Sequence, residues 1–164
     1  MVSAADTVRA VVDPELRVVT IGELGMVRDV STVDGRVTVT ITPTYAGCPA
    51  MDAIRADIAR ALAGAGHPGA VVRTELSPAW TTDWITPDGR AHLAAAGIAP
   101  PSRVGPVAPG PVVLGLPGGR GGAPACPRCG AAETEELSRF GAAPCRALWR
   151  CRACGEPFDA VKPL

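Results

Sequence analysis

Valines and other apolar residues recur among polar ones in the stretch from residue 27 to residue 42. From Val37 to Ile41 every second residue is apolar and the residues between are threonines, so a strand would carry the apolar side chains on one face. Asp34-Gly35 interrupts the stretch, and this dipeptide is typical of two-residue hairpin turns because both positions tolerate positive φ. The pattern predicts a half-buried antiparallel hairpin with strands at 27–33 and 36–42.

The spacing of apolar residues changes after this hairpin from two to three and four. The apolar positions at helical spacing are Met51, Ile54, Ile58 and Leu62. Pro49 suits the first turn of a helix, and Gly64 suits its end. We therefore expect an amphipathic helix with Pro49 in its first turn and a glycine stop.

Weaker patterns complete the first part of the chain. A short helix capped by Ser3 is expected over 4–12, ended by Asp13-Pro14-Glu15, because a proline restricts the residue before it. Residues 70–76 fit a third strand, and a last short helix opens at Thr86-Pro87. This αββαβ order predicts an α+β fold, a small mixed sheet with helices on one face.

The composition changes after residue 99. Residues 100–125 hold seven prolines and seven glycines without an apolar period, which is typical of a linker. Closely spaced cysteines then mark a second unit. The chain is therefore predicted to contain a first domain at 1–99, a linker at 100–125 and a small β-rich zinc-ribbon domain at 126–164.

Two C-x-x-C pairs, each followed by glycine, lie in the second unit with 21 residues between them. Two intervening residues allow both sulfurs of a pair to reach one ion, and the glycine lets the backbone turn so that amides face the thiolates. A unit of this size needs a stabilising element such as a bound metal ion, since it is too small for a stable core of its own. The predicted ligands of a tetrahedral ion are Cys126, Cys129, Cys151 and Cys154.

Four thiolates close the coordination sphere and leave no position for water, so the predicted ion is structural. We expect zinc, with iron as the alternative that an all-sulfur site also accepts. Two independent redox-active or unligated pairs are the competing interpretation. Cys145 lies between the pairs, and it is open to three interpretations: a spare ligand, a reactive thiol or a buried small residue.

Cys48 lies at the start of the predicted amphipathic helix. The partial positive charge of a helix N-terminus stabilises a thiolate, so we expect a lowered pKa for this thiol and a capacity to attack or to bind metal. A buried small residue at a strand–helix junction is the alternative. Asp13 and Glu15 flank Pro14 on a rigid turn, either as a solvated helix stop or as an acidic site that faces Cys48.

Charge and composition limit the functional classes. Lys plus Arg equals Asp plus Glu at 16 each, and a balanced chain lacks the positive field of nonspecific phosphate binding, so no nucleic-acid partner is expected. No stretch reaches the roughly 18 to 20 apolar residues of a membrane span, and the first residues do not resemble an export signal. We expect a cytoplasmic protein with no membrane partner, whose cysteines are reduced and bind metal.

Several segments, taken together, resemble one known family. They are DPELRVVTIGELGMV, TPTYAGCPAMD, SPAWTTDWIT, GRAHLAAAGIAPP and the cysteine-rich tail from CPRCG onward. The combination is similar to the PaaD family, accessory proteins of the bacterial phenylacetyl-CoA epoxidase. Residues 1–99 of this chain resemble the SufT-like domains that assist iron–sulfur cluster assembly or delivery. The resemblance covers nearly the whole chain except the linker.

The resemblance implies a maturation factor without turnover of its own, which helps to install or repair a metal centre of the epoxidase. It implies functional roles for Cys48, for Thr44 of the same segment, and for Asp13 and Glu15, and it makes Cys145 an additional candidate thiol. The implied cofactors are structural zinc and a transient iron–sulfur cluster or iron. The implied partners are the oxygenase or reductase subunits of the epoxidase and iron–sulfur assembly proteins, with a homodimer left open.

Two functions from other classes remain open. One is a thiol-dependent enzyme that acts on a CoA thioester through Cys48, although no histidine lies near it in sequence. The other is a zinc-ribbon adaptor protein.

Overall fold

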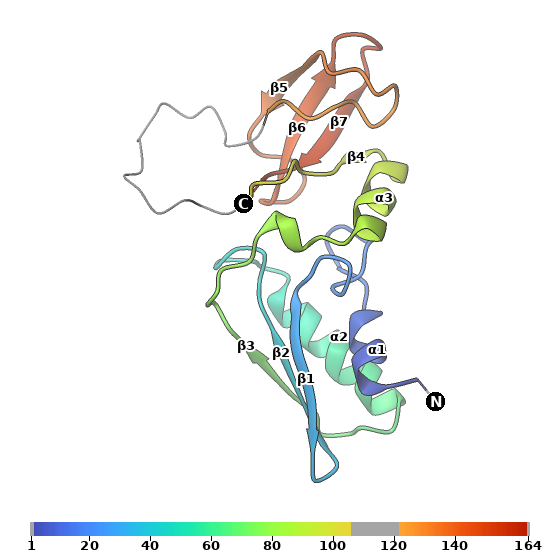
Figure 1. Ribbon diagram of the computed structural model, residues 1–164, viewed down its shortest axis with the longest axis vertical. Coiled ribbons are helices and arrows are strands. Elements are labelled where there is room, and N and C mark those ends of the chain that lie inside the picture. Colours follow the sequence, from blue (N-terminus) through green and yellow to red (C-terminus); the bar gives the residue numbers. More distant parts are fainter. Residues whose placement is uncertain (1, 106–121, 164) are drawn as a thin grey trace. The chain divides into compact units, whose positions relative to one another are not determined.

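A computed structural model describes residues 2–105 and 122–163 (Figure 1). Of the predicted linker, residues 106–121 therefore lie outside the described residues. In the described ranges, no helix is long and apolar enough to cross a membrane. The chain divides into two compact units, Met1–Trp80 with Trp84–His92, and Thr81–Asp83 with Leu93–Leu164.

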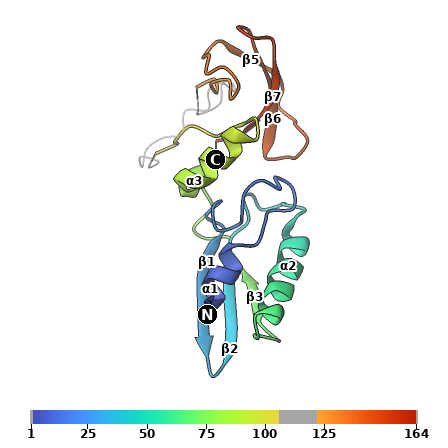
Figure 2. The same cartoon turned by 90° about the vertical axis from the view of Figure 1, so that its right-hand side faces the viewer.

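The first unit is an α+β fold with a three-stranded mixed sheet. β1 and β2 are antiparallel, and β3 adds to β2 in parallel. α1 contacts both α2 and β1, and α2 contacts β3 (Figure 2). The predicted α+β class, a small mixed sheet with helices on one face, is confirmed. The elements are α1 (Ala4–Arg9), β1 (Val27–Val33), β2 (Arg36–Ile41), α2 (Met51–Gly64) and β3 (Val71–Thr74).

The core of this unit follows the apolar patterns of the sequence. β2 buries every second residue from Val37 to Ile41, while the threonines between them are partly exposed. In the hairpin turn, Asp34 and Gly35 have φ values of 50° and 75°, the positive values that such a turn needs. The apolar side chains that α2 buries are Met51, Ile54, Ile58 and Leu62.

The segment after α1 departs from the prediction. α1 ends at Arg9, and not at residue 12, because the next residues pair with a later part of the chain. Val12 forms an antiparallel bridge with Thr20, and backbone hydrogen bonds on both sides of the bridge extend the pairing. This pairing closes a loop over residues 13–19. The Asp-Pro-Glu turn therefore lies in a closed loop and does not end the helix.

Two short helices lie between the two sheets in sequence, η1 (Thr82–Trp84) and α3 (Pro87–Ala95). α3 opens at the predicted position, because the Thr86 hydroxyl accepts a hydrogen bond from the Gly89 N–H at 3.0 Å and so caps the first turn. Gly89 also allows a close approach to Glu23, since a Cβ at this glycine would lie 3.0 Å from that residue.

The second unit is a four-stranded sheet that takes its first strand from residues before the Pro/Gly-rich segment. β5, β6 and β7 are antiparallel neighbours, and β4 pairs in parallel with β7 through Ile98 with Asp159 and Ala99 with Ala160. The unit therefore includes the chain from Leu93 onward, together with Thr81–Asp83. Its strands are β4 (Ile98–Ala99), β5 (Thr134–Ser138), β6 (Arg146–Cys151) and β7 (Pro157–Val161).

Candidate metal centre and thiol site

The two C-x-x-C pairs fold into two knuckles with the same hydrogen-bond pattern. In each, the N–H of the first cysteine donates to the carbonyl five residues later, and its own carbonyl accepts from the N–H of the glycine four residues later, all at 2.9 Å. These glycines, Gly130 and Gly155, have φ values of 75° and 78°. Left-handed backbone of this kind explains why a glycine follows each pair.

Backbone amides also face the sulfurs of the knuckles. The N–H groups of Ala131 and Glu156, each two residues after the second cysteine of its knuckle, donate to the sulfurs of Cys129 and Cys154. The N–H of Cys154 donates in turn to the sulfur of Cys151. Such donors stabilise thiolates, the form of cysteine that binds metal.

The four sulfurs fit one tetrahedral ion. All lie within 4.8 Å of one another, with 3.8 Å between the sulfurs of Cys126 and Cys154 and 3.6 Å between those of Cys129 and Cys151. Four sulfurs at about 2.3 Å from a central zinc lie about 3.8 Å apart in a regular tetrahedron. Within residues 2–105 and 122–163, this is the one group of three or more Cys, His, Asp or Glu side chains whose ligand atoms converge.

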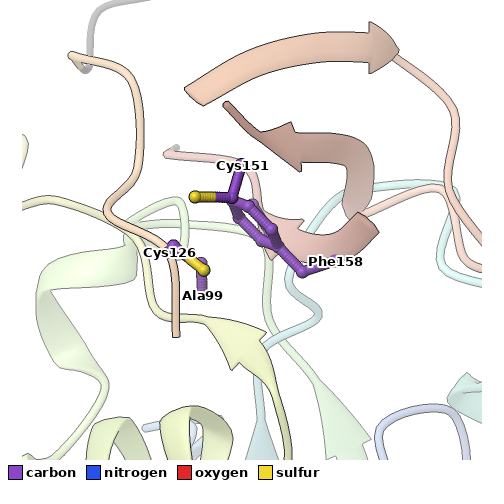
Figure 3. Close-up of a cluster of buried hydrophobic side chains, with 5 residues drawn as sticks. Ala99, Cys126, Cys151 and Phe158 are labelled. Carbon is purple, nitrogen blue, oxygen red and sulfur yellow. The ribbon is translucent and has the colours of Figure 1, made fainter. Parts of the chain in front are cut away.

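The cage formed by these four cysteines has a buried side and an exposed side. In each knuckle one cysteine is buried, Cys126 or Cys151, and the other is exposed. The two buried cysteines pack in an apolar cluster with Ala99, Phe158 and Ala160 (Figure 3). Water therefore reaches the cage from the side of the exposed cysteines.

Cys145 lies outside the cage, at the residue before β6. Its carbonyl accepts a hydrogen bond from the Lys162 N–H at 2.9 Å, and the residue is half-buried. Its sulfur does not belong to the converging group, so the geometry does not favour the interpretation as a spare ligand. A functional role for this thiol stays a prediction.

Cys48 lies between β2 and α2, in the first unit. α2 begins at Met51 with Ala50 as its N-cap, so Pro49 lies before the first turn and not within it, contrary to the prediction. The Cys48 N–H donates to the Tyr45 carbonyl at 3.1 Å, and the Ala50 N–H donates to the Cys48 sulfur. The thiol is therefore held on a tight turn at the helix end, where it is half-buried.

Carboxylates from the loop over residues 13–19 act on this thiol. Burial of Cys48 raises its pKa, and the charges of Glu15 and Asp13 raise it further. Hydrogen bonds from the Ala50 N–H and the Thr44 hydroxyl oppose these effects but do not cancel them. The predicted lowering of the thiol pKa is therefore wrong, because burial and two nearby negative charges outweigh the donors at the helix end.

Two family models match different parts of this chain. Residues 5–75 match the iron–sulfur cluster assembly protein family, and residues 115–162 match the PaaD zinc beta ribbon domain. A protein of Escherichia coli (strain K12), named provisionally as one of the subunits of 1,2-phenylacetyl-CoA epoxidase, is 42% identical over 150 residues. That match covers 92% of this chain and 85% of the relative. The chain belongs to the PaaD family.

A solved structure shares the fold of the first unit of this PaaD-family chain. It is a crystal structure of a domain of unknown function, DUF59, from Bacillus anthracis, with a TM-score of 0.52 and 28% identity, covering 55% of this chain and 87% of that one. A solution structure from Mycobacterium tuberculosis, of a protein described as associated with iron–sulfur complex assembly and repair, is 34% identical. It covers 57% of this chain and 82% of that one, but its TM-score of 0.33 adds nothing to the fold assignment.

Asp13 has a second task in the PaaD-family fold. It is 6% exposed, and its Oδ1 accepts hydrogen bonds from the N–H groups of Glu15 at 3.0 Å and Leu16 at 2.7 Å. These bonds cap the turn after Pro14 and fix the backbone position of Glu15. Burial of Asp13 therefore follows from the turn, whereas Glu15 stays partly exposed.

The sequence patterns missed two contributors to these sites. Ala99 joins the cage wall through β4, a strand of two residues that is too short to show an apolar period. The loop that carries the carboxylates is closed at the single bridge between Val12 and Thr20. Neither contact leaves a periodic signal in the sequence, because each depends on residues brought together by the fold.

Proposed function

We propose that this PaaD-family protein is a maturation factor that assists the assembly or repair of an iron–sulfur cluster in the multicomponent phenylacetyl-CoA epoxidase, without turnover of its own. The match of residues 5–75 to an iron–sulfur cluster assembly family supports the class, and the name of the E. coli relative supports the client. The observation that carries the proposal is the half-buried thiol of Cys48 beside Thr44, Asp13 and Glu15. Its partners are the oxygenase or reductase subunits and iron–sulfur assembly proteins.

A single protein sulfur suits an iron or iron–sulfur cluster that is bound transiently and then transferred. Among the described residues, no converging group of three ligating side chains includes Cys48. The other coordination positions of a bound iron therefore belong to the donor or acceptor protein, which allows exchange between them. Because burial and the carboxylates raise the thiol pKa, a proton competes with the metal for this sulfur, which favours release of the cargo.

The neighbours of Cys48 have separate roles in this proposal. Thr44 donates a hydrogen bond to the sulfur and so orients it. Asp13 fixes the turn, and Glu15 provides negative charge that attracts a cationic iron centre. The metal is drawn to the site by charge and held there by one sulfur.

Zinc is the proposed resident ion of the four-cysteine cage. Its donor set of four sulfurs at tetrahedral spacing fits zinc, and the matching family is a zinc ribbon. Zinc in such a cage holds the sheet together and offers no open coordination position. The knuckle cysteines and amides therefore hold the ion, and they perform no chemistry on a substrate.

A thiol-dependent enzyme has less support. A nucleophilic cysteine needs an adjacent base or a lowered pKa, and the groups that shift the pKa of Cys48 include no histidine and raise it overall. His92 instead pairs with Glu23, with 2.7 Å between Nδ1 and Oε1. His67 follows the far end of α2, where its N–H donates to the Leu62 carbonyl.

Co-expression tests the proposed function. The epoxidase subunits are produced with the wild-type chain, with Cys48→Ala, with Cys145→Ala and without the chain, and iron, sulfide and epoxidase activity are measured. We expect full cluster content with wild type, and depleted iron and sulfide with Cys48→Ala and without the chain. The Cys145→Ala preparation shows whether this second candidate thiol contributes to the same step. Equal cluster content in all four preparations would exclude a maturation role.

A further inference from the structure

The buried wall of the metal cage contains a residue that lies 27 positions before the first ligand. Ala99 is 1% exposed and packs in one apolar cluster with Cys126 and Cys151, which are 2% and 0% exposed. Figure 3 shows Ala99 beside Cys126, with the ring of Phe158 beside Cys151. The two buried cysteines are thus covered by side chains from β4 and β7.

β4 is held in position by its pairing in the ribbon sheet. It is two residues long and pairs only with β7 in the described sheet, through Ile98 with Asp159 and Ala99 with Ala160. β7 in turn continues from the second knuckle, which needs the ion to hold its sulfurs together. The position of β4 therefore depends on the metal cage.

The chain is also held a few residues beyond β4. The carboxylate of Asp83 accepts hydrogen bonds from the N–H of Val104 at 2.9 Å and of Gly105 at 2.8 Å. Asp83, β4 and residues 104–105 all belong to the second unit. The segment before the Pro/Gly-rich stretch is thus built into the metal-binding unit.

We propose that Ala99, presented by β4, is a positioning residue of the metal site that seals its buried side. While β4 is paired, metal exchange proceeds only at the exposed Cys129 and Cys154, and it is slow because two of the four sulfurs are out of reach. Metal occupancy and the pairing of β4 are then linked: the ion orders β4, and the loss of β4 from the sheet releases the ion.

The physical basis is access to sulfur. A metal–thiolate bond breaks when a proton or a competing ligand reaches the sulfur, and both need water or an open approach. Cys126 and Cys151 have neither while the cluster that Ala99 forms with Phe158 and Ala160 covers them. A polar side chain at Ala99 would have to bring water to this wall, because an unpaired charge is costly to bury.

The test compares Ala99→Asp with the control Ala96→Asp, which lies three residues earlier at an exposed position. Zinc release from the full chain to a chromophoric chelator is timed, and alkylation of each cysteine in the zinc-loaded protein is followed by mass spectrometry. We expect Ala99→Asp to release zinc at least about tenfold faster, and Ala96→Asp to match wild type. Equal release from Ala99→Asp and wild type would overturn the proposal.

The order of alkylation separates sealing from general loosening. In wild type, Cys129 and Cys154 should react before Cys126 and Cys151. Loss of the seal speeds the two buried cysteines selectively, whereas general destabilisation speeds all four together and would count against a sealing role. Ala99→Gly provides a variant that adds no bulk, and the same selective gain at Cys126 and Cys151 is expected there.

Hydrogen exchange of the wild-type chain provides a measurement that needs no variant. On removal of zinc, the amides of β4 should lose protection in the same step as those of β7, while those of β2 keep theirs. Continued protection of β4 after zinc removal would contradict the link between the ion and this strand.

Discussion

The two sulfur sites of this chain differ in how many ligands the fold brings together. In the second unit, four sulfurs lie within 4.8 Å of one another, backbone amides face them, and two of the four are buried. In the first unit, Cys48 is a single half-buried thiol, and its neighbours are carboxylates and a hydroxyl. A fold that supplies every ligand retains its ion, whereas one that supplies a single sulfur can only share it.

Loss of a cage ligand should have the largest effect on the second unit. Cys151→Ser removes one of four thiolates, and because metal binding and folding are coupled in such small units, the contribution at risk is about 10–16 kcal/mol. We expect loss of bound zinc and of the ribbon sheet, with the first unit still folded. Zinc analysis and hydrogen exchange of β2 and β6 measure both outcomes.

The matched control for that change is Cys145→Ser, which alters a cysteine of the same unit that lies outside the cage. Zinc content should stay at the wild-type level in this control. Stoichiometric zinc and an ordered ribbon in Cys151→Ser would disprove the four-cysteine site.

Removal of the Asp13 carboxylate should have the next largest effect. Asp13→Ala leaves the N–H groups of Glu15 and Leu16 without their acceptor in a buried turn, at a cost of about 1–3 kcal/mol for each unsatisfied group. Asp13→Asn retains an oxygen acceptor and should be milder. Denaturant unfolding of the first unit ranks the two variants, and equal stability of Asp13→Ala and wild type would exclude the capping role.

A glycine of the second knuckle should affect zinc affinity through the backbone alone. Gly155→Ala forces a side chain onto a residue with φ of 78°, which costs about 1–2 kcal/mol although open space surrounds the position. Zinc affinity should fall by about tenfold as a result. Gly122→Ala, in the same unit with open space and no positive φ, is the control and should bind zinc like wild type.

The smallest predicted effect concerns the reactivity of Cys48. Glu15→Gln removes a negative charge that raises the thiol pKa, so the pKa should fall and the thiolate should form at lower pH. The rate of alkylation of Cys48 as a function of pH should shift to lower pH, by a few-fold in rate below the midpoint. Asp52→Asn, in the first turn of α2, is the control, and an unchanged profile in Glu15→Gln would place that carboxylate out of range.

Much of the fold was accessible from local patterns. β2 buries every second residue and α2 buries the four predicted residues, because a single period of two or of three to four determines each of these elements. The start of α2 and the end of α1 were missed, since Pro49 and residues 10–12 are placed by contacts outside the helices.

The sites were accessible to a different extent. Two residues between cysteines constrain the sulfurs locally, so the convergence of the four thiols follows from their spacing. The pKa of Cys48 does not follow from position at a helix end, because Glu15 and Asp13 reach it through a loop closed more than twenty residues earlier in the chain. The contribution of Ala99 to the cage wall could not be predicted either, because it depends on the pairing of β4 with β7.

The division between a retained ion and a shared one is tested most directly by metal and sulfide analysis of the purified chain. Wild type and Cys48→Ala are mixed without oxygen with a cluster donor, and the zinc, iron and acid-labile sulfide bound to the chain are measured before and after the donor is removed. This division predicts stoichiometric zinc in both proteins throughout, with iron and sulfide only in wild type and only while the donor is present. Equal iron and sulfide in Cys48→Ala, or zinc displaced from the four-cysteine cage by iron, would contradict it.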